Sequence, residues 1–498
     1  MKNRIKQYLL AASMCVGLTA CSDFFEPIPG VQFGLDETFA SKQRTEEYLN
    51  NVYSYVREVT DAIHPNTYGG IFTEASLDGA NRWNKTYAEW TNGSFNSASA
   101  QASEYFSKYY QAIAKASTFI QNVDKCTEAA ASTRGKWKSE ARALRAYYYF
   151  ELLRLYGPIP LIGEDPIPLD ASLEELIKER NSVDECVNFI ATELQSAIDS
   201  GDLLQRAGKA NLGRMDVATC MALKAKLYLY WASPLFNGNT DQASVKNKDG
   251  KQLFPQTEDH SKWTQTRDAY ERFMTFATGQ GYKLTEVYTN GKLDPYASCR
   301  AAGEFFTTTW EAVDELIFVK LRDLYDYTYW VCPKFTDFQD TDVTGGGGYY
   351  TTQETVDLFF TKDGLTIEED PGYDKFEGIP GANNFTSGRY YDPNNPSRLY
   401  FDADKSKVLK QWKDREPRFY VNITYSGSIW LNEGKYNEEM RTDFTNGANG
   451  TCGKSKASGD CPDSGYLIRR GAKASNNNGS KHFSPVLRLA DMYLGYAE

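Results

Sequence analysis

Residues 139–162 read SEARALRAYYYFELLRLYGPIPLI, and this stretch decides the fold. Its apolar side chains recur at the spacing of one helical turn, at Ala141, Leu144, Tyr148, Leu152 and Leu155. The pair Gly157-Pro158 then ends the pattern, because proline cannot continue a helix and glycine favours the turn that follows one. The stretch therefore predicts a long helix with an apolar face that ends sharply before residue 157.

Helical periodicity dominates residues 40–280. Ser182 and Glu185 form a capping box ahead of a second helix, and further helices are expected over residues 216–231, from Ser261 to about residue 279, and from Arg488. Strand patterns are few and cover residues 315–321 and 418–431. The last helix stops in mid-pattern without a cap, so we expect that the C-terminus of this chain is truncated.

A comparison of the chain with itself suggests paired helices. Residues 143–150 recur as residues 222–229 and in part as residues 490–494, each with a small residue three positions before a tyrosine. This spacing is typical of tetratricopeptide helices, in which the small side chain lets the partner helix approach. No regular 34-residue period is present, so we expect a helical scaffold interrupted by long loops. These loops are rich in Gly, Asn, Asp, Ser and Pro and cover residues 232–262, 331–349, 367–398 and 432–482.

The composition is that of a globular protein with an acidic surface. The 498 residues are 41% hydrophobic and 24% charged, which excludes a disordered chain or a membrane protein with many spans. The chain has 55 basic and 66 acidic residues, for a net charge of -11, and we find no strong basic patch. Nucleic acid is therefore not an expected partner. Aromatic residues make up 14% of the chain, and 34 of them are tyrosines, which suit contact surfaces as well as cores.

The N-terminus has the pattern of an export signal. Basic residues precede the apolar stretch 8–16, and small residues precede Cys21. The sequence Leu18-Thr19-Ala20-Cys21 resembles the lipobox of bacterial lipoproteins, which implies lipidation of Cys21. We therefore expect a signal peptide over residues 1–20, a lipidated tether over residues 21–40 and the folded domain over residues 41–498. An ordinary secreted protein, cleaved before a cysteine, is the alternative.

The remaining cysteines do not suggest metal or redox chemistry. Cys126, Cys186 and Cys220 lie in helical patterns and are expected to be buried as small hydrophobic residues. Cys452 and Cys461 flank a polar loop, and the sequence leaves a disulfide between them open. The chain has no CxxC motif.

Residues 139–162 closely resemble the signature of the SusD/RagB family of outer-membrane nutrient-binding lipoproteins. Other segments resemble the family in the same order, namely Gly213-Arg214 ahead of a helix, residues 315–318, residues 354–364, residues 414–418 and residues 488–498. The resemblance implies a mostly α fold in a single large domain, with tetratricopeptide-like helix pairs, long loops and a few short strands. It also implies a protein at the outer membrane, facing the cell exterior, that captures a glycan and delivers it to a TonB-dependent, SusC-like transporter.

Two loop segments have the chemistry that a glycan binder needs. Flat rings cover the apolar faces of sugars, while planar amide, carboxylate and guanidinium groups bind their hydroxyls. The first segment supplies such a set within fifteen residues: Asp78, Asn81, Arg82, Trp83, Trp90 and Asn92. It matches the region where starch-binding members of the family place their site. The second follows the strand at 315–321, where the family tends to supply opposing aromatics: Tyr325, Tyr327, Tyr329 and Trp330. The alternative is that these rings pack in a core.

Motifs for catalysis are missing from the sequence. It has three histidines and neither HExxH nor GxSxG, and Gly453-Lys454-Ser455 lacks the first glycine of a P-loop. We therefore expect a non-enzyme without catalytic residues, metal or cofactor. The run Asp337, Asp340 and Asp342 fits a solvated acidic loop better than a structural calcium site. Three alternatives remain open: a peptide-capturing relative, a lipid-anchored glycoside hydrolase that needs only two carboxylates, and a helical scaffold with protein partners alone.

Overall fold

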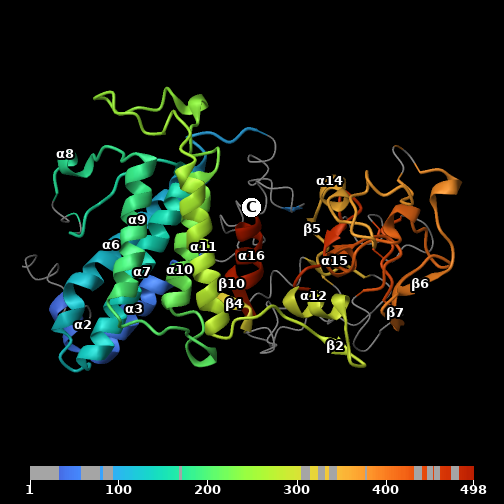
Figure 1. Cartoon of the computed structure of the whole chain (residues 1–498), viewed down its shortest axis with the longest axis horizontal. Helices are drawn as coiled ribbons and strands as arrows, with labels where there is room; N and C mark the ends of the chain where they lie inside the picture. Colours follow the sequence, from blue (N-terminus) through green and yellow to red (C-terminus); the bar gives the residue numbers. More distant parts are fainter. Residues whose placement is uncertain are drawn as a thin grey trace, which may run out of the picture.

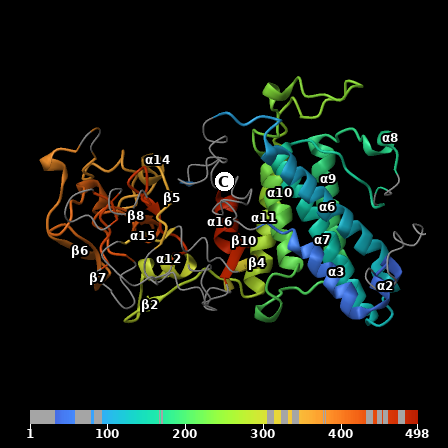
Figure 2. The same cartoon turned by 180° about the vertical axis from the view of Figure 1, so that it is seen from behind.

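The long helices lie side by side and form one half of the molecule. The computed structural model describes residues 33–57, 79–81, 93–165, 167, 171–303, 314–322, 331–335, 345–375, 378, 380–430, 440–445, 452–453, 460–472 and 482–498. Figure 1, and Figure 2 from behind, show the helical half on one side and a half of short helices, strands and loops on the other. The predicted mostly helical fold with few short strands is therefore confirmed.

The helical half is built from consecutive helices that pack on one another. Its longer members are α3 (Lys42–Ser54), α6 (Ala100–Asn122), α7 (Ala131–Tyr156), α9 (Val183–Asp199), α10 (Val217–Ala232) and α11 (Ser261–Gly279). Its short members are α2 (Leu35–Ala40), α8 (Leu173–Leu176), η2 (Val123–Lys125), η3 (Lys209–Asn211) and η4 (Thr240–Gln242). From α6 to α11 each longer helix contacts the next one along the chain, which produces the expected stack of helix pairs. Phe39 of α2 is fully buried in this half.

The ends of these helices follow the predicted signals. Glu185 accepts a hydrogen bond from the Ser182 backbone N–H at 2.8 Å, and the Ser182 hydroxyl accepts one from the Glu185 N–H at 3.3 Å, so the capping box of α9 is present. The helix α7 ends at Gly157, which has a φ of +67° that favours glycine.

The helix α7 is buried around most of its circumference. Almost every side chain from Ser139 to Leu153 is buried, more than the single apolar face that the sequence predicts. Its polar groups therefore need partners inside the protein. The Tyr148 hydroxyl donates to the Val52 carbonyl of α3, and the Tyr149 hydroxyl donates to the Ile162 carbonyl at 2.8 Å.

A buried ion pair joins three helices of this half. Arg145 of α7 is fully buried and contacts the Glu193 carboxylate of α9 at 2.6 and 2.8 Å. Arg145 also donates to the Ser117 hydroxyl of α6 at 3.0 Å, while Arg142 contacts Glu193 at 2.9 Å. A partnerless charge in such a site costs several kcal/mol, on the order of 3–5. The pair therefore favours the one arrangement in which α6, α7 and α9 meet.

The second half has its own aromatic core and short elements. Its helices are α12 (Pro295–Gly303), α14 (Gln353–Asp357), α15 (Pro417–Asn422), η7 (Ala382–Asn384) and η8 (Lys410–Trp412). A four-stranded antiparallel sheet has the order β1 (Ala80–Asn81), β5 (Tyr349–Tyr350), β9 (Leu467–Ile468), β8 (Ile423–Thr424). Two hairpins are formed by β2 (Tyr288–Thr289) with β3 (Lys292–Leu293) and by β6 (Arg389–Asp392) with β7 (Asn395–Asp402). Tyr400 and Tyr420 stack at 3.9 Å in the core.

A separate antiparallel pair lies between the two halves. It consists of β4 (Leu316–Arg322) and β10 (His482–Arg488), and β10 continues into α16 (Leu489–Ala497), which packs on α10 and α11. Ile317 and Phe318 of β4 are buried in the core of the helical half. The strand predicted over 315–321 and the helix predicted from Arg488 are both confirmed.

One predicted strand is wrong. Residues 418–431 begin inside α15, and only Ile423 and Thr424 form a regular strand, β8. Pro417 occupies the first turn of α15. Backbone N–H groups in the first turn make no hydrogen bond within the helix, so proline loses none there, and its fixed φ suits a helix. The apolar residues after it, such as Phe419, are buried in the aromatic core from a helix. The apolar run that predicts a strand therefore belongs in part to a helical turn.

The cysteines in the helices lie where the sequence places them. Cys126, Cys186 and Cys220 are fully buried. Cys452 and Cys461 are buried thiols, so the structure does not have the disulfide that the sequence left open between them.

Asp216 at the start of α10 generates a pH-dependent prediction. Its carboxylate accepts hydrogen bonds from the Thr219 and Ala207 backbone N–H groups, both at 2.7 Å. Burial nevertheless raises the pKa of Asp216 to about 6. Between pH ~4 and ~6 the native state keeps a proton that the unfolded chain releases, so Asp216 contributes less stability as the pH rises.

We expect the stability difference between wild type and Asp216→Asn to fall by about 2–3 kcal/mol from pH 4 to pH 7. Asparagine keeps an acceptor for the cap but does not titrate. Urea unfolding at several pH values measures the difference, with the exposed Asp249→Asn as the control variant. A difference that is the same at every pH would contradict the assigned pKa.

Candidate functional site

The predicted ligand residues lie almost entirely outside the described residues. This holds for Asp78, Arg82, Trp83, Trp90, Asn92, Tyr325, Tyr327, Tyr329 and Trp330, for Cys21 and for the acidic run Asp337, Asp340 and Asp342. Asn81 is described as part of the backbone of β1. The structure does show how both predicted segments are attached to the rest of the fold, and these attachments define the candidate site.

The first segment, residues 78–92, is attached to the four-stranded sheet. Ala80 pairs with Tyr350 and Asn81 pairs with Tyr349, so β1 is the edge strand next to β5. The preceding residue, Gly79, is buried, and a Cβ there would lie 2.5 Å from Ile468 Cδ1 of β9 and 3.1 Å from the Tyr349 ring. Glycine therefore allows the chain to approach the sheet closely just where the predicted ligand segment begins.

The second segment, residues 325–330, is attached to the chain that leads into the same strand. It is followed by Val331 and Cys332, which are buried. The Gly347 N–H donates to the Cys332 carbonyl at 2.9 Å, and the Gly345 N–H donates to the Pro333 carbonyl at 3.0 Å. Since Gly347 is two residues before Tyr349, the partner of Asn81, the described residues Ala80 and Asn81 of the first segment and those that follow the second are both bonded to the chain at β5.

Gly347 is the residue in this junction that a side chain would disturb. Its φ is +54°, and a Cβ would lie 2.9 Å from the Asp460 carbonyl oxygen. Asp460 forms an ion pair with Lys334, which lies three residues after the buried Val331. Phe335 packs edge-on against the buried Trp430 at 6.5 Å. The chain that directly follows the second segment is therefore held by packing and charge as well as by the backbone.

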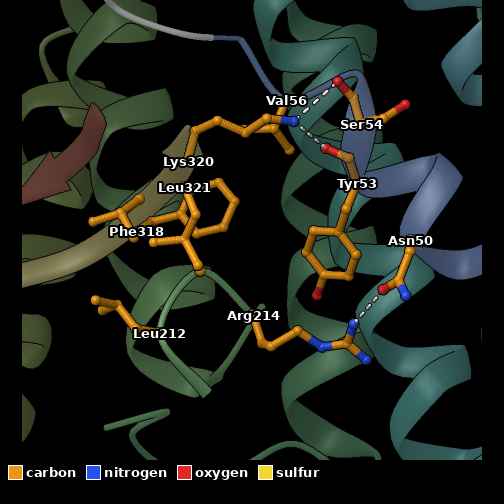
Figure 3. Close-up of a pocket in the computed structure, with 11 residues that line it drawn as sticks. Asn50, Tyr53, Ser54, Val56, Leu212, Arg214, Phe318, Lys320 and Leu321 are labelled. Atoms are coloured by element: carbon orange, nitrogen blue, oxygen red, sulfur yellow. Dashed lines mark hydrogen bonds between the residues drawn. The ribbon is translucent and has the colours of Figure 1, made fainter. Parts of the chain in front are cut away.

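A pocket lies where β4 meets the end of α3 (Figure 3). It has a volume of about 310 Å³ and lies between the end of α3, the turn Leu212–Arg214 and the strand β4. The end of β4, at Arg322, comes shortly before the second predicted segment, whereas residues 55–77 separate the end of α3 from the first. Lys320 of β4 reaches across and donates to the Tyr53 and Ser54 carbonyls at 3.0 Å each. One side chain thus joins the strand that precedes the second segment to the end of α3.

Arg214 forms the opposite wall of this pocket. Its guanidinium donates to Asn50 Oδ1 at 3.0 Å and forms an ion pair with Glu140 at 2.9 Å. The Tyr53 hydroxyl donates to Glu140 at 3.0 Å and accepts from the Met215 N–H at 2.8 Å. Burial raises the pKa of Tyr53 well above its ordinary value, so the hydroxyl remains a donor at neutral pH. These contacts hold the turn and α3 together.

The described lining of the pocket in Figure 3 is neutral or basic. The pocket in Figure 3 has no carboxylate among the described side chains that line it. Within the described ranges no group of three or more His, Cys, Asp or Glu is placed to hold a metal ion. None of the helices between residues 33 and 498 that the structure describes is both long and apolar enough to cross a bilayer.

Sequence reasoning missed the residues that position the two segments. The sequence pattern places Gly79 and Gly347 only in loops, although a glycine beside a strand indicates a close approach of the backbone. Lys320 interrupts the apolar run of its strand, and a lone charge at such a position is the signal that could have drawn attention to it.

Two family models match the chain. The model described as "SusD family" matches residues 315–498, and the model described as "Starch-binding associating with outer membrane" matches residues 32–229. A SusD-like protein of Bacteroides ovatus is 27% identical over 175 residues, which cover 34% of this chain. That match spans 30% of the length of the relative.

Solved structures share the fold. The protein BT4246 matches with a TM-score of 0.72 and 24% identity, over 92% of this chain and 78% of that one. A SusD-like carbohydrate binding protein of Bacteroides fragilis, BF0978, matches with a TM-score of 0.59 and 17% identity, over 92% and 74% of the two chains. These likenesses confirm that the helical half and the second half occur together in known structures.

Lys320 yields a prediction about the end of α3. Lys320→Met removes the charged donor that the Tyr53 and Ser54 carbonyls share, and a hydrogen bond to a charged group is worth roughly 1.5–3 kcal/mol. We expect amide hydrogen exchange in residues 52–57 to accelerate roughly tenfold or more. Lys320→Arg keeps a donor and should exchange much like the wild type. If Lys320→Met leaves the exchange of these amides unchanged, the contact does not hold the end of the helix.

Proposed function

The chain belongs to the SusD/RagB family, and on this premise we propose that it is a surface lipoprotein that binds a glycan without cleaving it. We propose further that it passes the glycan to a TonB-dependent, SusC-like transporter in the outer membrane.

The observation that carries the proposal is the attachment of two aromatic-rich segments to one strand. Residues 78–92 begin at β1, residues 325–330 end just before Cys332, and both attachments lead to β5. The segments contain three tryptophans and four tyrosines together with Asp, Asn and Arg. Rings for the faces of sugars, and planar polar groups for their hydroxyls, then come from two sides of one site.

The relatives favour a carbohydrate as the ligand. One matching family model is described as starch-binding, and the Bacteroides fragilis structure is titled a carbohydrate binding protein. The loops that differ between such proteins are the ones that contact ligand, so the proposal names a glycan and leaves its sugar composition to experiment.

Binding without hydrolysis fits the described pocket better than a glycosidase does. A glycosidase needs two carboxylates that face each other across the bond that is broken. Glu140, which contacts Arg214 and Tyr53 of the pocket lining, is fully buried. It is therefore placed to support the turn and not to protonate a ligand.

The anchor and location are part of the same proposal. Lipidation of Cys21 would add acyl chains beyond the two signals that stable anchoring needs, so no spanning helix is required. The family description "associating with outer membrane" supports this location. The body would then sit above the bilayer on the tether, with the two aromatic segments available to glycans outside the cell.

We expect Trp83→Ala and Trp330→Ala each to abolish glycan binding while the far-UV circular dichroism of the helices stays unchanged. Loss of a ring removes the surface on which the sugar stacks. Native gels that each contain one polysaccharide (soluble starch, laminarin, yeast mannan, xylan or pectin) measure binding as retarded migration.

Trp263→Ala serves as the matched control, because Trp263 lies in α11 of the helical half, away from both segments in the chain. Normal retardation of both Trp83→Ala and Trp330→Ala would show that the site is elsewhere. Release of reducing ends from a polysaccharide would favour the glycosidase instead. Binding of peptides but of no polysaccharide in the panel would favour the peptide-capturing relative.

A further inference from the structure

A second pocket, lined by an exposed tyrosine, lies at the opposite end of β4 from Lys320. It has a volume of about 310 Å³, and its lining includes Lys283, Leu284, Glu286, Tyr288 and Asp314. Asp314 directly precedes Glu315 and β4, and the Lys283 N–H donates to the Asp314 carbonyl at 3.1 Å. The start of β4 therefore forms one wall of the pocket.

The tyrosine is held in a defined orientation although it is exposed. Tyr288 is 60% exposed on β2, and its hydroxyl donates to Glu286 Oε2 at 2.9 Å. The hairpin that carries it turns at Asn290 and Gly291, which both have positive φ, of 53° and 76°. This pair forms the tight turn that matches the twist of two short strands. The ring is thus presented without the freedom of an ordinary surface side chain.

The base of the hairpin is fixed by a buried ion pair. Asp294 accepts from the Thr289 hydroxyl and the Ala297 N–H, both at 2.9 Å, and so joins β2 to the start of α12. Both terminal nitrogens of Arg398 donate to this carboxylate at 3.0 Å. A site on a rigid element loses less freedom when a ligand binds, so such a hairpin is a suitable place for a contact surface. Figures 1 and 2 both show β2 at the edge of the molecule, next to α12.

The polar groups of the pocket suit hydroxyls better than charges. Asp314 is held by Arg206 at 2.9 Å and by Lys283 at 3.5 Å, so its charge is balanced and its orientation is fixed. A second carboxylate, Glu286, lies beside the ring and disfavours an anionic ligand. A purely apolar ligand would cover these carboxylates and remove their hydrogen bonds to water without offering new ones. A sugar has both an apolar face for the ring and hydroxyl donors for the carboxylates.

We propose that the Tyr288 pocket is a second glycan contact that engages only long chains; this inference rests on the proposed function. The strand β4 has seven residues, about 20 Å at the usual rise per residue, between this pocket and the end that precedes residues 325–330. One polysaccharide chain can reach both contacts, whereas a short oligosaccharide can occupy only one. Once one contact holds the polysaccharide, the other part of the same chain is at a high effective concentration near the second contact, which therefore strengthens polysaccharide binding.

The test compares a long and a short form of one glycan. The polysaccharide of the gel panel that retards the wild type is used in affinity gels, and its trisaccharide is used in calorimetric titration. We expect Tyr288→Ala to weaken polysaccharide binding roughly threefold to tenfold and to leave trisaccharide binding unchanged. Tyr288→Phe keeps the ring and should retain most of the polysaccharide binding. Tyr493→Ala, which removes an exposed tyrosine from α16, serves as the control and should bind as the wild type does.

The other outcomes separate the two proposals. If Tyr288→Ala binds the polysaccharide as tightly as the wild type does, the second contact is overturned and the proposed function stays intact. Equal loss of trisaccharide and polysaccharide binding would place Tyr288 in the main site and also overturn it. If the wild type is retarded by no polysaccharide, both the proposed function and the second contact fail.

Discussion

The arrangement of the molecule depends on β4, a seven-residue strand that contacts both a second strand and the helical half. Its backbone pairs with β10, its residues Ile317 and Phe318 enter the core of the helical half, and Lys320 binds the last carbonyls of α3. A lysine that leaves a buried strand to bind two backbone carbonyls fixes the distance between strand and helix. Because the second predicted segment follows β4 in the chain, β4 determines where the chain leaves the described fold ahead of that segment.

Buried ion pairs in the helical half also fix the positions of its elements. Burying Arg145 with Glu193, or Glu140 with Arg214, costs desolvation that apolar residues of similar size would avoid. What such pairs provide is a single arrangement, since a shifted helix would leave a charge without its partner. The proposed binding loops would need a support of this kind, because loops bind well when their ends do not move.

The helices could be predicted from the sequence because their signals are local. The period of α7, the capping box of α9 and the stop at Gly157 each depend on residues within a few turns. The strand proposed for residues 418–431 was wrong because Pro417 and the aromatic core decide that segment, and neither contact is visible in an alternation pattern. Position 79 needs glycine because Ile468 lies close to it, and position 347 needs glycine because the Asp460 carbonyl does. Both contacts are distant in the sequence, so neither need could be predicted from neighbouring residues. The ligand residues themselves came from composition and resemblance, and they stay a prediction.

The central claim is that residues 78–92 and 325–330 form the two sides of one glycan site. Hydroxyl-radical footprinting of the intact protein, with and without the polysaccharide that retards it, tests this claim most directly. The account predicts that Trp83, Trp90, Tyr327 and Trp330 lose reactivity together when the polysaccharide is added, while Trp263 in α11 does not. Protection of only one of the two segments, or of neither, would contradict it.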